Sequence, residues 1–502
     1  GSFTGINLIT SSIDINRDTK AYLGDDTNGQ LSLKNASGDT GLVKVHAENK
    51  DGAKGGISND VDSDLFDIAE NNIVDNVAAY IENADLDVEE LRVSAINSAS
   101  YAATGKTTSN TASGATSAYI SNSDVDASAP TTIDDGVIVS AEDRSSYSAL
   151  SGDSQEFSLV DEVTLNLTEI SNMGLQVGKS SAINDINKNT TAFVNDSSDI
   201  DVLNGDLGVY ALSDLVVVGE ASAVALIDNT AGVFFNTNSA SIGGTFVSNQ
   251  LLGDTSAYVL NSIVTADESV GDVVVDATNT SAVTANAEST STASGGSTGT
   301  FAASVAFNAI GWDITNVAAA TLDALIGTEL GASEDRSEAI AYIESSKLTV
   351  GNDLSVNAES AQQLNATVSN VSDSTGQALA GANGIGVGGI VASNRVLSAA
   401  QAYLKDMETG NSEALSVTGD IQVSATDSAG IYSNSKIITS QITTNTGGVD
   451  VLNDGSAALI PLLGASDYNV GSLHAGDGPW AVNYGELVTL PFDHDKSLGE
   501  PG

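Results

Sequence analysis

The chain repeats one short phrase seven times: a small residue, an aromatic residue and an aliphatic residue. The copies are Ala21-Tyr22-Leu23, Ala79-Tyr80-Ile81, Ala118-Tyr119-Ile120, Ala192-Phe193-Val194, Ala257-Tyr258-Val259, Ala341-Tyr342-Ile343 and Ala402-Tyr403-Leu404. Each is followed by an alternating run that ends in Ala, such as Val273-Val274-Val275-Asp276-Ala277. Self-similarity of this kind is typical of a solenoid, in which each unit packs only on its neighbours.

The runs alternate with a period of two residues, which is the period of a β-strand. In Val43-Lys44-Val45-His46-Ala47 the apolar side chains therefore line one face. Clusters such as Asn49-Lys50-Asp51-Gly52 read as turns, because Asn, Asp and Gly tolerate positive φ. Only 5 prolines occur among 502 residues, which suits a chain of hydrogen-bonded strands. The sequence predicts an all-β fold.

Small side chains decide between the β architectures. A sandwich of two antiparallel sheets needs large aromatic residues to fill its core, and this chain is 5% aromatic. A parallel β-helix (β-solenoid) accommodates Ala, Val and Thr stacked in ladders. We therefore expect a parallel β-helix, with the aromatic phrases at equivalent corners and their aliphatic residues inward. With roughly 20 residues and ~4.8 Å per rung, it would be a rod on the order of 100 Å long.

Two segments interrupt the β pattern. Apolar residues at helical spacing from Asp313 to Leu330 predict an amphipathic helical insertion at about 313–330, and Asp64–Asn76 is a weaker helix candidate. The tracts Thr107–Ser117 and Ser289–Thr300 are rich in Ser, Thr, Gly and Ala, and are either linkers or tight rungs. We expect the solenoid to span residues 1–440 and residues 441–502 to be its C-terminal end and a spacer.

Charge limits the partners. The chain has 17 Lys and Arg against 66 Asp and Glu, a formal net charge of -49. Nucleic acids and anionic membrane surfaces would be repelled, so we expect neither nucleic-acid binding nor membrane insertion. A strong negative field favours solubility and attracts divalent cations. Cysteine is absent, which excludes disulfides and thiolate metal sites.

Calcium is the one cofactor that the sequence indicates. Asp60, Asp62 and Asp64 alternate as the carboxylates of a calcium loop do. The loop is not an EF-hand, since Leu65 and Asn71 replace the required Gly and Glu. A solvated acidic turn is the alternative for this cluster and for two others, Asp25-Asp26 with Asn28 and Asp196 with Asp199 and Asp201.

Catalytic motifs do not stand out. Gly295-Gly296-Ser297-Thr298-Gly299 matches Gly-x-Ser-x-Gly, but it lies in a Ser/Thr/Gly tract and not between a buried strand and a helix. Polysaccharide-cleaving β-helices need paired carboxylates beside sugar-stacking aromatics, and no single pair can be chosen among 66 acids with 2 tryptophans. We expect no enzyme activity; the alternative is a carbohydrate-active β-helix, either a lyase or hydrolase or a glycan-binding module.

Longer phrases carry a resemblance. Thr255–Ser262 followed by Gly271–Ala277, and Phe301–Ile310 followed by Ala339–Ser346, fit a repeat of small-rich strand, Asn-x-Ile, Ala-Tyr-Ile-x-x-Ser and Gly-Asp-Val-x-Val-x-Ala. This repeat resembles those of giant secreted surface proteins of Gram-negative bacteria, the haemagglutinin-like and LEPR-XLL-type proteins. Residues 484–502 are similar to a spacer of that class, and no clean copy occurs around Leu212–Gln250.

The resemblance implies a structural or adhesive segment of a very large extracellular protein, acting as a stalk or contact surface. Its partners would be other repeats of the same parent chain and a host-cell, neighbouring-cell or glycan surface. It supplies no catalytic residues. The opening Gly1-Ser2-Phe3 reads like a cloning scar, so we expect a piece of a longer parent chain.

Overall fold

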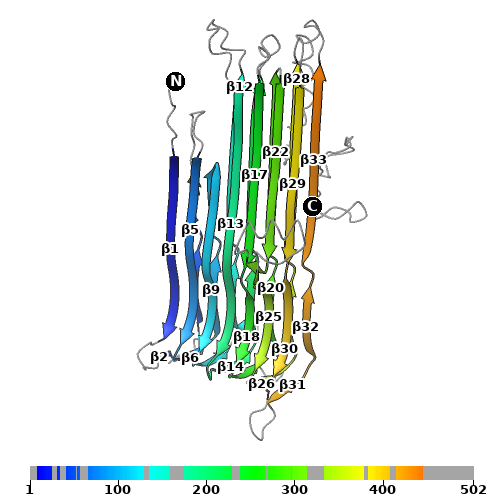
Figure 1. Cartoon of the computed structure of the whole chain (residues 1–502). Coiled ribbons are helices and arrows are strands. Elements are labelled where there is room, and N and C mark those ends of the chain that lie inside the picture. Colours follow the sequence, from blue (N-terminus) through cyan, green and yellow to red (C-terminus); the bar gives the residue numbers. More distant parts are fainter. Residues whose placement is uncertain are drawn as a thin grey trace, which may run out of the picture.

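The computed structural model is a stack of long parallel strands (Figure 1). It describes residues 8–24, 31–33, 41–52, 54–56, 66–128, 135–158, 174–228, 238–266, 270–295, 297–313, 333–377, 383–407 and 414–444. These residues form strands, turns and bends without a helix, and so none of them forms a helix able to span a membrane. The predicted all-β parallel β-solenoid is confirmed. The helix predicted at about 313–330 lies, from residue 314 on, outside the described residues.

Four sheets contain nearly all the strands. The first consists of β1 (Leu8–Gly24), β5 (Phe66–Glu82), β9 (Thr107–Ser121), β13 (Gly174–Asn195), β17 (Asn238–Leu252), β18 (Thr255–Leu260), β22 (Ser297–Ile310), β25 (Ser337–Glu344), β29 (Asn383–Val396) and β30 (Ser398–Lys405). The second consists of β2 (Leu31–Leu33), β6 (Ala84–Val88), β10 (Asp124–Ser128), β14 (Asp199–Asn204), β19 (Ile263–Ala266), β26 (Lys347–Val350) and β31 (Leu415–Val417).

The third and fourth sheets complete the stack. The third consists of β3 (Leu42–Asn49), β7 (Glu90–Asn97), β11 (Asp135–Asp143), β15 (Asp206–Ser213), β20 (Val273–Asn279), β27 (Leu354–Ser360) and β32 (Ile421–Asp427). The fourth consists of β4 (Lys54–Gly56), β8 (Ser100–Gly105), β12 (Ser146–Ser158), β16 (Val216–Asp228), β21 (Ala282–Gly295), β28 (Gln363–Gln377) and β33 (Gly430–Thr444). A small antiparallel pair joins β23 (Trp312–Asp313) to β24 (Ser333–Glu334).

The chain passes through the four sheets in turn, and one such passage is a coil. Seven coils stack, from coil 1 (β1–β4) to coil 7 (β29–β33), and each strand pairs in parallel with its counterpart in the next coil. Each coil contains one aromatic phrase, and the phrases align residue for residue, for example Tyr22 with Tyr80 and Tyr342 with Tyr403. The seven copies in the sequence are therefore the seven coils.

The predicted rung of roughly 20 residues and the predicted rod are wrong. Successive aromatic positions are separated by 39 residues at the least (Tyr80 to Tyr119) and by 84 at the most (Tyr258 to Tyr342). At ~4.8 Å per coil the stack rises only about 30 Å, whereas 22-residue β13 extends over about 70 Å. The molecule is broader along its strands than along its stacking axis. The prediction failed because the Ser- and Thr-rich halves of the first- and fourth-sheet strands carry no recurring phrase.

The core follows the period of two. In each phrase the small and aliphatic residues point inward, so that Ala79 and Ile81 are fully buried while Tyr80 between them lies on the outer face. The first three sheets enclose the largest apolar cluster, which runs from coil to coil through residues such as Leu91 and Val139. A second cluster and a third fill the space between the first and fourth sheets. The predicted inward position of the aliphatic residues is confirmed.

A tight corner follows the phrase in coils 2 to 7. The residue three positions after the aromatic has φ between 45° and 58° in six coils; these residues are Asn83, Asn122, Asp196, Asn261, Ser345 and Asp406. Asn and Asp are among the residues that best tolerate this left-handed conformation. The corners stay hydrogen-bonded between coils, since the Asn261 amide donates to the Glu344 carbonyl at 3.0 Å. The position of these residues thus sets where the chain turns from the first sheet into the second.

A ladder of asparagines runs through the interior. From coil 2 on, Nδ2 of each side chain donates to Oδ1 of the next at 2.8 to 3.0 Å; the members are Asn71, Asn110, Asn184, Asn249, Asn308 and Asn394. The first five are fully buried. Several Nδ2 groups also donate to carbonyls of the fourth sheet, as Asn184 does to Val218 at 2.8 Å. The ladder therefore ties neighbouring coils together and joins two sheets.

The helix predicted at Asp64–Asn76 is wrong, because residues 66–76 belong to strand β5. Its inward positions include Asn71 and Asp75, two polar residues, so the apolar period of two is hidden there. The two Ser- and Thr-rich tracts also form strands, β9 and the adjoining parts of β21 and β22. Of the two alternatives for those tracts, tight rungs are the correct one.

We predict that Asn184→Ala strongly destabilises the chain. The substitution leaves the Nδ2 of Asn110 and the Oδ1 of Asn249 without their ladder partner, and an unsatisfied buried polar group costs roughly 1–3 kcal/mol. Asn72→Ala is the matched control, because Asn72 is exposed and its Nδ2 donates to Asp14 at 2.9 Å at the surface. Urea unfolding followed by circular dichroism measures both. Equal midpoints for the two variants would contradict a stabilising ladder.

Candidate functional site

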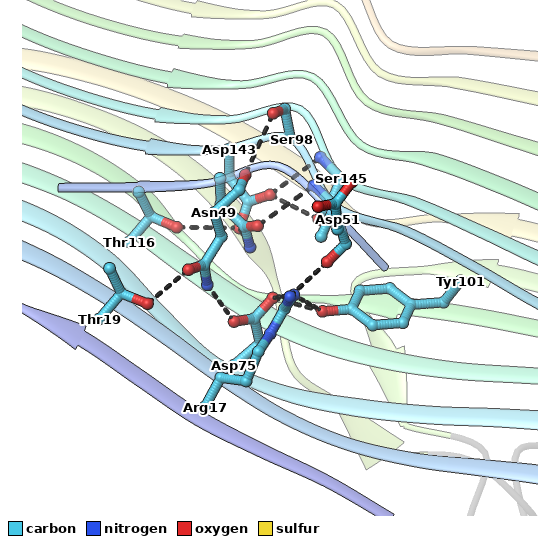
Figure 2. Close-up of polar contacts among 12 residues, drawn as sticks. Arg17, Thr19, Asn49, Asp51, Asp75, Ser98, Tyr101, Thr116, Asp143 and Ser145 are labelled. Carbon is cyan, nitrogen blue, oxygen red and sulfur yellow. Dashed lines mark hydrogen bonds and ion pairs between the residues drawn. The ribbon is translucent and has the colours of Figure 1, made fainter. Parts of the chain in front are cut away.

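A cluster of charged side chains lies inside the first coils (Figure 2). Arg17 on β1, Asp75 on β5 and Lys188 on β13 occupy one column of the first sheet, and Asp143 enters from the end of β11. The side chains of Asp75, Asp143 and Lys188 are fully buried, while that of Arg17 is 30% exposed. Two acids and two bases make the cluster formally neutral, which is what burial of charge requires.

Asp75 is hydrogen-bonded on both oxygens. Its Oδ2 accepts from Arg17 Nη2 at 3.0 Å and from the Tyr101 hydroxyl at 2.6 Å, and its Oδ1 accepts from Asn49 Nδ2. Arg17 also contacts the Tyr101 hydroxyl and the backbone carbonyl of Asp51. Burial, followed by the hydrogen bond to Asp75, raises the pKa of Tyr101 well above its ordinary value. Tyr101 therefore stays a hydrogen-bond donor at neutral pH.

Lys188 bridges coils that are not adjacent to one another in the stack. Its Nζ lies 3.6 Å from Asp143 Oδ2 and donates to the Asp75 carbonyl at 2.6 Å. The side chain reaches Asp75 past Gly114, where a Cβ would lie 2.3 Å from the Asp75 carbonyl oxygen. Glycine at 114, with φ of 126°, is thus what keeps this space open.

The carboxylate of Asp143 is also hydrogen-bonded on both oxygens. Oδ1 accepts from the Ser145 amide at 3.0 Å and from its hydroxyl at 2.5 Å, and Oδ2 accepts from Thr116 at 3.1 Å and Asn97 at 3.3 Å. A general acid or base must reach a substrate, and both carboxylates here are buried and fully bonded within the protein. The cluster is suited to holding four coils in register.

A second candidate feature is an outer ladder of seven stacked rings. Adjacent ring centroids lie 4.7 to 5.2 Å apart at interplanar angles of 3° to 10°; the rings belong to Tyr22, Tyr80, Tyr119, Phe193, Tyr258, Tyr342 and Tyr403. Burial raises the pKa of Tyr119 to about 12, and the nearby side chains of Tyr80 and Glu82 contribute to this rise. A sugar stacks on the face of a ring, and here five inner rings have both faces covered by neighbours. The ladder offers solvent mainly ring edges.

A third feature is a grid of aspartates on the second sheet. Asp85, Asp124 and Asp199 align across three coils, and Asp87, Asp126 and Asp201 align beside them. Burial raises the pKa of Asp126, and the nearby carboxylates of Asp124 and Asp201 raise it further. The pKa of Asp199 is raised by burial and then by Asp201 and Asp124. Like charges in register destabilise the folded state, so this grid opposes folding at neutral pH.

The predicted calcium ligands Asp60, Asp62 and Asp64 lie outside the described residues, as do Asp25, Asp26 and Asn28. Asp196, Asp199 and Asp201 are described, with Asp196 in the left-handed corner and the other two on β14. Throughout the described ranges, no three His, Asp or Glu side chains form a group that could hold a metal ion.

The buried charged cluster was missed by the sequence reasoning, although a signal existed. Counting back in steps of two from the inward Ala79 places Asp75 inward, and counting back from Ala192 places Lys188 inward. Charged residues at inward positions of a strand require a partner of opposite charge, so each of the two pointed to a buried ion pair; the partners are Arg17 for Asp75 and Asp143 for Lys188.

Comparison with known proteins identifies no relative: no family model, no curated protein and no solved structure matches the chain.

We predict that Lys188→Met lowers the free energy of unfolding by roughly 3–5 kcal/mol, because it leaves a buried aspartate charge without its partner. Adding Asp143→Asn should restore most of the loss. Lys405→Met is the control: its ion pair with Glu344 lies at the surface, where solvent screens the attraction, so its loss should leave stability nearly unchanged. Chemical denaturation at pH 7 separates the three. An unchanged free energy of unfolding for Lys188→Met would contradict the structural role of the cluster.

We predict that Asp126→Asn raises the Tm at pH 7. Because the pKa of Asp126 is raised on folding, the charged carboxylate favours the unfolded chain, and stability is lost as pH rises through the folded pKa. At about pH 3, below the ordinary pKa of ~3.9, aspartate and asparagine are both neutral and the two melting curves should coincide. Calorimetry at the two pH values tests this, and a gain of equal size at both would exclude charge repulsion as its cause.

Proposed function

We propose that this chain is a structural or adhesive segment of a very large extracellular bacterial surface protein, acting as a rigid contact surface. The observation that carries the proposal is that the distinctive side chains of this chain bind one another. The rings, the asparagines and the buried charges bond mainly to their own counterparts in neighbouring coils. Such residues stabilise a stack and leave few groups free for substrate chemistry.

The shape favours a contact surface over a stalk. Seven coils rise only about 30 Å, so about 440 residues add little length. The long strands of the first and fourth sheets instead lie side by side as broad faces (Figure 1). Along these faces the paired residues of successive coils line up in columns. A columnar surface of this kind suits repeated contacts with a partner surface.

The extracellular location rests on composition and on the repeat. The absence of cysteine avoids mispairing in an oxidising setting, and the net charge of -49 keeps a large surface soluble. The repeat resembles those of giant secreted proteins of Gram-negative bacteria. Two observations argue against the carbohydrate-active alternative. The ring faces are covered by neighbouring rings, and the carboxylates of Asp75 and Asp143 are hydrogen-bonded within the protein.

Surface labelling of intact cells tests the location. Antibodies raised against the 502-residue chain should label unpermeabilised cells of the source organism, and protease treatment of intact cells should remove the signal. Labelling only after permeabilisation would overturn the proposal. Incubation with polysaccharides should release no product; turnover abolished by one substitution would favour the carbohydrate-active alternative.

Calcium remains part of the proposal as a prediction. Divalent cations that bridge aspartates remove their repulsion and stabilise the folded chain by mass action. At low ionic strength the Tm should be higher with millimolar calcium than with chelator. Replacing Asp60, Asp62 and Asp64 together with Asn should reduce that difference. Identical melting curves with calcium and with chelator would contradict calcium binding, and the excess of acidic residues would then serve only solubility.

A further inference from the structure

One ion pair of the buried cluster differs in geometry from an ordinary salt bridge. Lys188 Nζ lies 3.6 Å from Asp143 Oδ2, which is longer than a hydrogen bond, and both side chains are 0% exposed. The exposed pair of Lys405 and Glu344 shows the ordinary distance, 2.7 Å. The short contact of Lys188 Nζ, at 2.6 Å, is with the neutral backbone carbonyl of Asp75. An amine therefore lies beside a carboxyl group in a site closed to solvent, without a short ion pair between them.

The surrounding backbone fixes the amine in this place. Lys188 belongs to coil 4, and its side chain extends past Gly114 of coil 3, where any side chain at position 114 would meet the Asp75 carbonyl. Asp143 meets it from β11, a strand of another sheet. Two groups held together in this way react as if each were present at an effective concentration on the order of 10⁵ M or more.

The carboxyl group of Asp143 is surrounded by donors that suit attack on its carbon. Oδ1 accepts from the backbone amide of Ser145 at 3.0 Å and from the Ser145 hydroxyl at 2.5 Å. Two donors directed at one carboxyl oxygen form an oxyanion hole, which stabilises the charge that develops there when a nucleophile adds to the carbon. Oδ2, the oxygen that Lys188 approaches, accepts from the Thr116 hydroxyl at 3.1 Å. The two oxygens are thus suited to different roles.

We propose that Lys188 and Asp143 condense, after the chain has folded, into an intramolecular amide (isopeptide) bond that joins coils 3 and 4. The folded chain itself supplies the nucleophile, the carboxyl group and the oxyanion hole. The inference rests on the buried cluster and is independent of the proposed function.

The reaction is a condensation that needs no further reactant. A proton passes from the Lys188 ammonium to Oδ2 of Asp143, and the resulting amine attacks the carboxyl carbon Cγ. The Nζ–Cγ bond forms while the negative charge on Oδ1 is held by Ser145. The Cγ–Oδ2 bond then breaks, and Oδ2 takes a second proton from the nitrogen and leaves as water. One cation and one anion have become a neutral amide and one water molecule.

Removal of buried charge favours the product. Ions inside a protein carry a desolvation penalty, and the amide replaces two of them by one neutral group. The rest of the cluster stays neutral, because Arg17 and Asp75 remain paired at 3.0 Å. Asp75 is the less suitable reaction partner, since its carboxylate bonds Arg17 and the Tyr101 hydroxyl while Lys188 contacts its backbone carbonyl.

The ion pair is the reactant, so it precedes the amide. A chain that is isolated unfolded and then refolded begins with the pair intact, and in such freshly refolded chains the loss of stability predicted for Lys188→Met reflects the ion pair alone. Once the amide has formed, it closes a covalent ring over residues 143–188. Like any cross-link, this ring restricts the unfolded chain and so stabilises the folded one.

Intact-mass spectrometry of the full chain under denaturing conditions tests the bond. A chain isolated unfolded should have the full mass of its sequence, and after refolding it should become lighter by one water with first-order kinetics. A protease digest should contain one branched peptide that joins Lys188 to Asp143, and none that joins Lys405 to Glu344. Lys188→Arg keeps the positive charge but lacks the amine, so it should keep the full mass.

Two serine variants test the oxyanion hole. Ser145→Ala removes one donor to Oδ1 and should slow the loss of water on the order of 100-fold. Ser146→Ala is the matched control, because the Ser146 hydroxyl donates to Ser100 at the surface, and its rate should be unchanged. Circular dichroism must show all variants folded. A refolded parent chain that keeps the full mass throughout incubation would overturn the proposal, and so would a loss of water that persists in Lys188→Arg, as a succinimide would produce.

Discussion

Contact between like side chains in neighbouring coils is the interaction on which the rest of the structure depends. A parallel stack places residue above residue at ~4.8 Å, a spacing at which aromatic rings lie face to face and amides hydrogen-bond along the column. The ring ladder and the asparagine ladder use this spacing on opposite faces of the first sheet. Together they oppose a shift of one coil by even one residue, because such a shift would turn every inward side chain outward.

Register in turn explains the corners and the buried charges. Each corner residue with positive φ follows its ring by three positions, so an aligned ladder brings the corners into line. Lys188 can meet Asp143 and Asp75 only because coils 2, 3 and 4 are held in fixed positions. The ladder of asparagines has a defined beginning: coil 1 has Ile13 in that column, and Asn71 Oδ1 is left buried without a partner.

The sequence predicted the architecture but not its dimensions. The phrase around Tyr80 marks one corner of each coil, and corner residues recur because their backbone conformation demands them. The strand halves away from the corner need only small or polar side chains, so residues 107–117 and Ala282–Gly295 repeat no motif, and coil length was underestimated. The buried charges were missed for a related reason. The inward position of Asp75 and Lys188 can be inferred only by counting in steps of two from the neighbouring apolar residues.

Register between coils is tested most directly by a disulfide within one chain. Ser117 and Thr191 are paired across β9 and β13, 74 positions apart in the sequence, and lie on the outer face. Paired positions of adjacent strands fall within the Cα separation of about 4.4–6.8 Å that a disulfide requires. Ser117→Cys with Thr191→Cys should therefore oxidise readily without loss of stability, whereas Ser117→Cys with Asn189→Cys, shifted by two residues, should not. Equal oxidation of both pairs, or preference for the shifted one, would contradict the in-register stack.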